Sequence, residues 1–200
     1  MTLQTLTLSI PALETRPSTV ATLGQRWWAE VERRRALRAA DRGRPVVLGS
    51  ASRPFDPVAG QSLLESLQGL GSSTIRCIVD AAPRALVEKL RELDRRHAVR
   101  IDVVCRGREE APRALTLLRR LAEQGLEARL LLTLGLQHLQ RTPTLGDHAW
   151  LSDLARGIRL AGGSDLEFEG AKRGPARPWL EAVTLQRLRH ELPQTPSGRG

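Results

Sequence analysis

Residues 74–105 read TIRCIVDAAPRALVEKLRELDRRHAVRIDVVC, and this stretch decides the fold class. It begins with one short apolar run, residues 74–80, and ends with another, residues 99–105. Between them, residues 83–97 place leucine and valine at helical spacing behind a proline in the first turn. A strand, a helix and a second strand in this order are typical of a unit whose two strands run parallel.

The same alternation continues on both sides of this unit. Upstream, residues 45–50 predict a strand and residues 58–70 a helix; downstream, residues 109–125 predict a helix and residues 127–133 a strand. Strand and helix therefore alternate three times, and the strands are short and mostly apolar. We expect an α/β protein with a mainly parallel sheet of four or more strands, flanked by helices that cover both of its faces.

The C-terminal third is less regular. Turn residues are frequent in residues 134–175, and three apolar patches there predict short strands that form an irregular antiparallel edge of the sheet: residues 149–151, 158–160 and 166–168. A final amphipathic helix is predicted for residues 177–192. The expected organisation is an N-terminal strand (residues 3–10) and basic helix within residues 1–44, a single α/β domain over residues 45–192, and a disordered tail over residues 193–200.

The first helix is predicted to begin at Ser18 or Thr19, either of which can cap it, and to stop at Gly43. One face of it begins apolar and becomes basic, through Val20, Trp27, Val31, Arg34 and Arg38. We expect the apolar half to dock on the sheet. The basic half then projects beyond the core and offers four arginines to something acidic: Arg34, Arg35, Arg38 and Arg42. Part of their charge is neutralised by Glu30 and Asp41 at helical spacing, and a solvated helix without a partner is the alternative.

The composition agrees with an acidic partner. The 200 residues include 31 basic and 22 acidic side chains, a formal net charge of +9, which attracts polyanions. All but two of the basic residues are arginine, whose guanidinium pairs bidentately with phosphate. A GC-rich bacterial genome produces the same excess of arginine over lysine, and that alternative stays open. Aromatic residues make up only 3%, so we expect contact with backbone phosphates rather than stacking on bases.

Ligands of open parallel sheets bind beyond the carboxyl ends of the strands. The residues at those ends include Ser50, Asp80 and Arg106, which form a candidate phosphate or nucleotide site. The loop after the first of these strands, residues 49–57, carries neither the GxGxxG nor the GxxxxGK[ST] phosphate-binding pattern, and no cofactor is predicted. Asp80 has a second interpretation, as the cap of the helix that follows it.

Residues 147–165 read DHAWLSDLARGIRLAGGSD and place His148, Asp153, Gly163 and Ser164 in that order. Over residues 45–168 this outline resembles the phospholipase D-like fold, whose His-x-Lys motif is followed by an Asp and then a Gly-Ser pair. The resemblance implies a phosphodiesterase or nuclease with His148 as nucleophile. Trp150 stands where the family has its lysine, and Asp153 comes two residues early, so the motif is degenerate and lacks a cation that would stabilise the transition state.

From the residue types alone, His148 and Asp153 also form a candidate general base and its orienting carboxylate, while the interpretation without chemistry is a strand, a turn and a second strand. Cys77 and Cys105 stand in apolar runs without metal-ligand spacing, so we expect reduced core cysteines and no metal. The N-terminus lacks the basic segment of a signal peptide and no apolar run is long enough to span a membrane, which predicts a cytoplasmic protein.

These observations favour a non-enzymatic basic α/β module of a bacterial assembly, which binds nucleic-acid backbone or an acidic protein partner. Two alternatives stay open. One is a phospholipase D-like phosphodiesterase or nuclease with a degenerate motif, and the other is a nucleotide-sensing domain that uses the strand ends. The sequence does not indicate an oligomeric state.

Overall fold

The computed structural model describes residues 19–58, 60–69, 71, 73–170 and 174–191. The predicted strand at residues 3–10, the capping residue Ser18 and the tail at residues 193–200 lie outside this range. In chain order the elements are α1 (Thr19–Asp41), β1 (Val46–Leu48), α2 (Gln61–Gln68), β2 (Thr74–Val79), α3 (Arg84–Asp94), β3 (Ala98–Cys105), α4 (Ala111–Glu123), β4 (Glu127–Leu132), α5 (Leu136–Leu139), α6 (Leu145–Leu160), β5 (Leu166–Phe168) and α7 (Arg177–Glu191).

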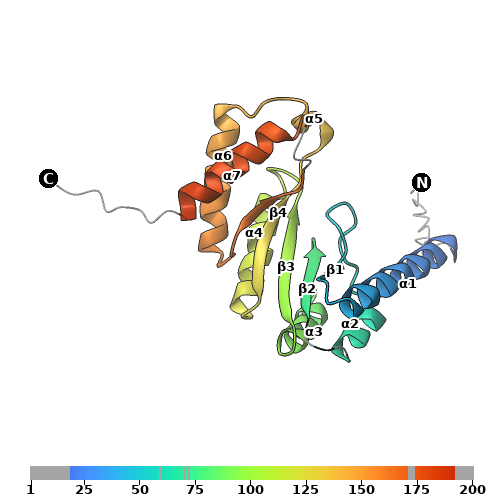
Figure 1. The fold of residues 1–200 in the computed structure, drawn as a ribbon. Coiled ribbons are helices and arrows are strands. Elements are labelled where there is room, and N and C mark those ends of the chain that lie inside the picture. The colour runs from blue at the N-terminus through green and yellow to red at the C-terminus, as the bar shows by residue number, and fades with distance from the viewer. Residues whose placement is uncertain (1–18, 59, 70, 72, 171–173, 192–200) are drawn as a thin grey trace, which may run out of the picture.

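The five strands form one sheet in the order β1-β2-β3-β4-β5, and Figure 1 shows β1 to β4 side by side. Every neighbouring pair is parallel, β4 with β5 included. The predicted fold class, an α/β protein with a mainly parallel sheet of four or more strands and flanking helices, is therefore confirmed. The short connections explain the sequential order, because each strand returns to the place next to its predecessor.

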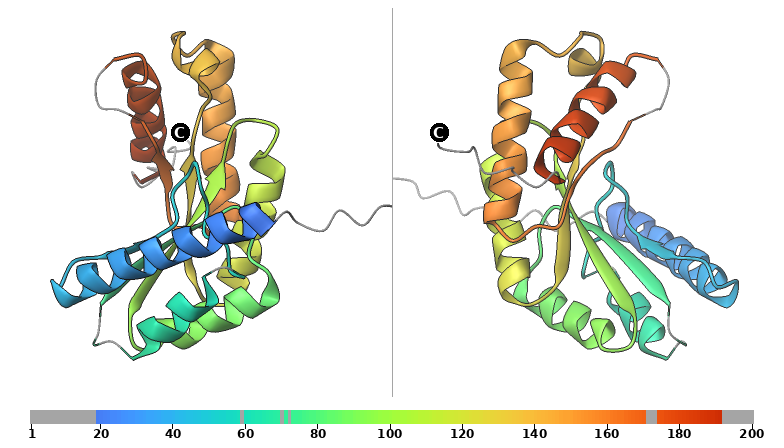
Figure 2. Two further views of the ribbon diagram at one scale, coloured as in Figure 1. Left: turned by 90° about the vertical axis from the view of Figure 1, so that its right-hand side faces the viewer. Right: turned by 60° about the vertical axis from the view of Figure 1, so that its left-hand side comes forward.

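The sheet has one apolar face and one mixed face. Side chains alternate along each strand, so Cys77, Ile101 and Leu130 share a face, and they belong to the main core together with buried residues of α2, α3, α4 and α6. These helices gather on one face because right-handed crossovers that all step in the same direction must lie on the same side (Figure 2).

The opposite face carries a separate, small apolar cluster in which no member comes from a helix: Ala51, Ile78, Val104 and Leu131. Most of the remaining positions on this face are charged. The expectation that helices cover both faces of the sheet is therefore wrong for the residues that the structure describes. Helix α7 lies at the β5 edge, where it packs against α6 and β5.

The predicted antiparallel edge is also wrong. Residues 145–160 form the helix α6, and the one strand that follows, β5, pairs parallel with β4. The apolar patches at 149–151 and 158–160 are successive turns of that helix, whose buried side chains recur at helical spacing. Gly157 sits inside α6 where a Cβ atom would come within 2.9 Å of Leu115 in α4, so this glycine permits close packing of two helices and does not mark a turn.

Candidate functional site

The outward face of α1 and the turn that follows it carry the four arginines singled out from the sequence. Ala36 is only 2% exposed and packs into the main core. At about 100° of rotation per residue, Arg34 and Arg38 point about 160° away from Ala36 and Arg35 about 100° away, and Arg42 lies in the turn that follows the end of the helix. All four side chains are exposed to solvent. The helix therefore presents one continuous basic face beside β1.

Among the arginines of α1 whose side chains the structure describes, Arg33 and Arg34 are partly neutralised. Glu30 accepts from Nε of both Arg33 and Arg34 at 2.8 Å, and these hydrogen bonds lower the pKa of the Glu30 carboxyl to about 2. Among the side chains that the structure describes, no carboxylate lies within ion-pair distance of Arg35, Arg38 or Arg42. The expected pairing of Asp41 with Arg38 is thus not formed, and no described carboxylate compensates these three exposed charges.

The orientation of α1 reverses the one expected from sequence. Its second half packs on the protein, through Ala36, Ala39 and Ala40, and α1 contacts β1. Trp27, in the half that was expected to dock, is 61% exposed. Small alanines on the inner side allow the helix to approach β1 closely, so the basic half is held against the core and its arginines are directed outward rather than carried on a projecting arm.

The stretch that contains His148 and Asp153 is helical, not strand-turn-strand. Five residues apart on α6, these two side chains point about 140° away from each other, and Asp153 pairs instead with Arg156 at 2.6 Å. Gly163 and Ser164 follow the opposite end of α6, about 20 Å from His148 along the helix axis. The structure therefore does not bring the four residues of the phospholipase D-like pattern together.

A structural role accounts for Asp147, the residue that precedes His148. Its carboxylate closes a capping box with Thr144 at the start of α6 and receives Nη2 of Arg141 at 3.1 Å. These contacts hold the pKa of the Asp147 carboxyl well below its usual range, with the hydrogen bond from Arg141 as the main cause. Arg141 also stacks on Trp179, 5.3 Å from the ring centroid. The residues around His148 thus tie α6 to α7.

Of the three residues at the strand ends, Asp80 and Arg106 are in contact, and Arg106 also reaches the loop that holds Ser50. Arg106 Nη2 lies 3.4 Å from Asp80 Oδ2 and 3.5 Å from the carbonyl oxygen of Ala51, in the loop that holds Ser50. Arg106 also faces Glu110 at 3.7 Å. One guanidinium between two carboxylates leaves a net negative charge, which does not favour phosphate. The N-cap of α3 is Pro83, so the capping role considered for Asp80 is wrong.

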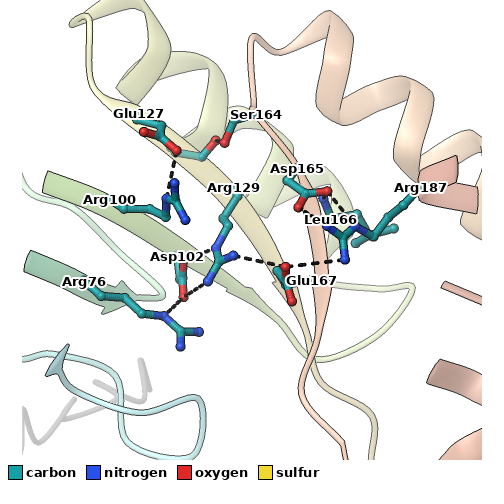
Figure 3. Close-up of polar contacts among 11 residues, drawn as sticks. Arg76, Arg100, Asp102, Glu127, Arg129, Ser164, Asp165, Leu166, Glu167 and Arg187 are labelled. Carbon is teal, nitrogen blue, oxygen red and sulfur yellow. Dashed lines mark hydrogen bonds and ion pairs between the residues drawn. The ribbon is translucent and has the colours of Figure 1, made fainter. Parts of the chain in front are cut away.

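A network on the mixed face of the sheet was missed by sequence reasoning (Figure 3). Asp102 is fully buried, and it accepts from Nε of Arg76 and, at 2.6 Å, from Nε of Arg129. Arg129 reaches on to Glu167 at 3.1 Å, and Arg187 of α7 pairs with Asp165 at 2.7 Å. Charged residues at every second position of the predicted strands were the available signal, because strand alternation places them on one face.

Comparisons with other proteins supply no relative. No protein-family model matches the chain, and no curated protein or solved structure is significantly similar to it. Within the described residues, no helix combines the length and apolar character needed to cross a membrane, and no three or more His, Cys, Asp and Glu side chains are grouped so that they could hold a metal ion. Cys77 and Cys105 are both buried, as expected from their apolar surroundings, and neither is joined in a disulfide within the described part of the chain.

Proposed function

We propose that this protein binds the phosphate backbone of nucleic acid through the outward face of α1. The observation that carries the proposal is the set of exposed arginines along α1 and the turn that follows it, three of which have no carboxylate partner among the described side chains: Arg35, Arg38 and Arg42. Guanidinium groups spaced three and four residues apart match the repeated charge of a sugar-phosphate backbone.

The balance of charge over the chain supports the same partner. The formal net charge is +9, while the arginines of the sheet are largely paired with carboxylates. The surplus therefore lies on helices and loops, where it faces solvent. Backbone phosphates accept such contacts without regard to sequence, so we expect weakly sequence-specific binding that is sensitive to salt and involves no chemical turnover.

The test is fluorescence anisotropy of labelled single- and double-stranded DNA and RNA, titrated with the protein at several salt concentrations. We expect a dissociation constant of about micromolar order near 50 mM salt that rises steeply with salt. Each phosphate contact contributes about −0.9 to the slope of log K against log salt on duplex DNA, so the double variant R35E/R38E should reduce the slope by about 2.

The matched control is R119E/R120E in α4, which makes the same change of net charge at two exposed arginines over β3 and β4. Binding that survives in the control and is lost in the α1 variant supports the proposal. Equal loss in both variants indicates attraction by net charge alone and contradicts an interface on α1. Absence of binding by the unaltered protein near 50 mM salt also contradicts it and leaves an acidic protein as the partner to test.

A further inference from the structure

A second cluster of arginines lies on the mixed face of the sheet, away from the outward face of α1. Arg76 of β2, Arg100 of β3 and Arg129 of β4 line one cavity of about 520 Å³ at the amino-terminal half of the strands. A cavity of this size accommodates a small organic molecule. Pro45 and Val47 supply part of its apolar wall, and the carboxylates of Asp94 and Glu127 also line it.

Two of these guanidinium groups keep most of their donors free, and one does not. Arg129 is only 12% exposed and is occupied by Asp102 and Glu167. Arg76 contributes only its Nε, to Asp102, and Arg100 contributes only its Nε, to Glu127 at 2.8 Å. Within the described residues the Nη groups of Arg76 and Arg100 make no hydrogen bond, so four nitrogen atoms with their hydrogens remain available in the cavity.

The register of the sheet sets these two arginines directly opposite each other. Arg76 and Arg100 are paired positions of the parallel strands β2 and β3, and both side chains leave the same face, as Figure 3 shows. Like charges at directly opposed positions are destabilising. Asp102 anchors Arg76 from a fully buried position and Glu127 holds Arg100, so neither side chain is free to turn away from the other without losing its ion pair.

We propose that this cavity binds a small organic oxyanion, a phosphate or a carboxylate, between Arg76 and Arg100. An anion with two or more oxygen atoms can accept from the Nη groups of both side chains at once, in the bidentate geometry that guanidinium favours. Such a ligand also removes the repulsion between the two opposed charges. The residues of the site belong to β2 and β3, so this inference does not depend on nucleic-acid binding by α1.

The experiment is isothermal titration calorimetry at low ionic strength, with inorganic pyrophosphate and citrate as separate probes for the phosphate and carboxylate sources. We expect one equivalent of at least one probe to bind, and the tighter of the two to identify the class of ligand. The variant R100Q should weaken that binding about tenfold or more, because a hydrogen bond to a charged group is lost. The variant R76Q should have the same effect. If R76Q does not fold, because Asp102 has lost one of its two arginine partners, R100Q alone tests the proposal.

Two controls make the result specific. R84Q removes an exposed arginine of α3 that, like Arg100, is held by one carboxylate through Nε at 2.8 Å, and it should bind as the unaltered protein does. The α1 variant R35E/R38E should likewise retain the probe. The proposal is overturned if neither probe binds, if R100Q binds as well as the unaltered protein, or if R84Q or R35E/R38E loses the probe to the same extent as R100Q.

Discussion

The two faces of the sheet are stabilised by different means. On the helix-covered face, residues such as Ile101 and Leu130 have no exposed surface and pack among the helices. On the opposite face, positions one residue along the same strands carry Asp102 and Arg129, which are joined by an ion pair at 2.6 Å. The first face gains from removal of apolar surface from water, whereas the second depends on each buried charge having a partner.

This difference shows how a parallel sheet with helices gathered on one side can keep its other face from being an apolar, aggregation-prone surface. Charged side chains at alternate positions cover the backbone and satisfy one another, and only Ile78, Val104, Leu131 and the loop residue Ala51 form an apolar cluster there. The charged face tolerates fewer substitutions, because each charged side chain needs its partner of opposite charge on a neighbouring strand, across β2, β3 and β4. The apolar face tolerates changes that conserve volume.

Removal of Asp102 should have the largest effect. We expect D102A to lower the free energy of unfolding by about 3–5 kcal/mol, because Arg76 and Arg129 lose the carboxylate that lies between them. Urea denaturation followed by circular dichroism measures the change. The triple variant R76L/D102L/R129L, which removes all three charges together, should be less destabilised than D102A. A cost for D102A below about 1 kcal/mol would show that this network does not stabilise the charged face.

Adjacent leucines of β4 compare the two faces directly. Leu130 points into the main core and Leu131 into the small cluster on the opposite face. L130A should cost about 3 kcal/mol, since a cavity opens among helices that cannot close it, and L131A should cost about 2 kcal/mol in a thinner layer. Thermal and urea denaturation of the two variants test this order, and a larger loss for L131A would contradict the assignment of the main core.

The ion pair between Asp147 and Arg141, outside the sheet, should make the free energy of unfolding depend on pH. D147N should cost about 2 kcal/mol near neutral pH because the bonds to Arg141 and Thr144 are weakened. The folded-state pKa of Asp147 is depressed below its ordinary value of 3.8, so its contribution is complete above that value and is lost as the pH falls below it. The difference in stability between the two proteins, measured from pH 7 to pH 2.5, should therefore narrow progressively once the pH falls below 3.8. A constant difference would contradict this.

The arginines of α1 should have the smallest effect on stability. R35A and R38A should each change the free energy of unfolding by less than about 0.5 kcal/mol, because neither side chain is buried or paired with a described carboxylate. Denaturation curves that overlay that of the unaltered protein, alongside weakened nucleic-acid binding, would separate these arginines from those that hold the sheet. A loss above about 1 kcal/mol would indicate that they are part of the fold.

The strands and helices of residues 74–133 were predictable from sequence, whereas the helix α6 was not. Residues 74–133 alternate between apolar runs and helical stripes, and the structure confirms their strands and helices. In α6 the apolar positions also follow a helical period, but Gly157 and short apolar patches resemble turns and strands. A Cβ atom at Gly157 would come within 2.9 Å of Leu115, and such a contact is not visible in a linear pattern.

Some of the candidate sites were likewise predictable from sequence and others were not. The sequence places Ser50, Asp80 and Arg106 at strand ends, which parallel pairing is bound to bring together, and they do lie close in space. The suggested pairing of His148 with Asp153 is not formed, because both residues lie on α6 and a spacing of five residues in a helix turns the two side chains away from each other. The Asp102 network joins β2, β3 and β4, so its partners are specified only when the strands are in register.

By itself, the sequence determined the α/β class, the parallel strands and the arginine-rich face of α1, because hydrophobic period and helical spacing are local properties of the chain. Tertiary structure alone decided which face of the sheet the helices cover, which half of α1 docks on the core, and which arginines are neutralised. These depend on strand order, on the handedness of the connections and on register, which relate residues that are distant in sequence and become neighbours only in the folded protein.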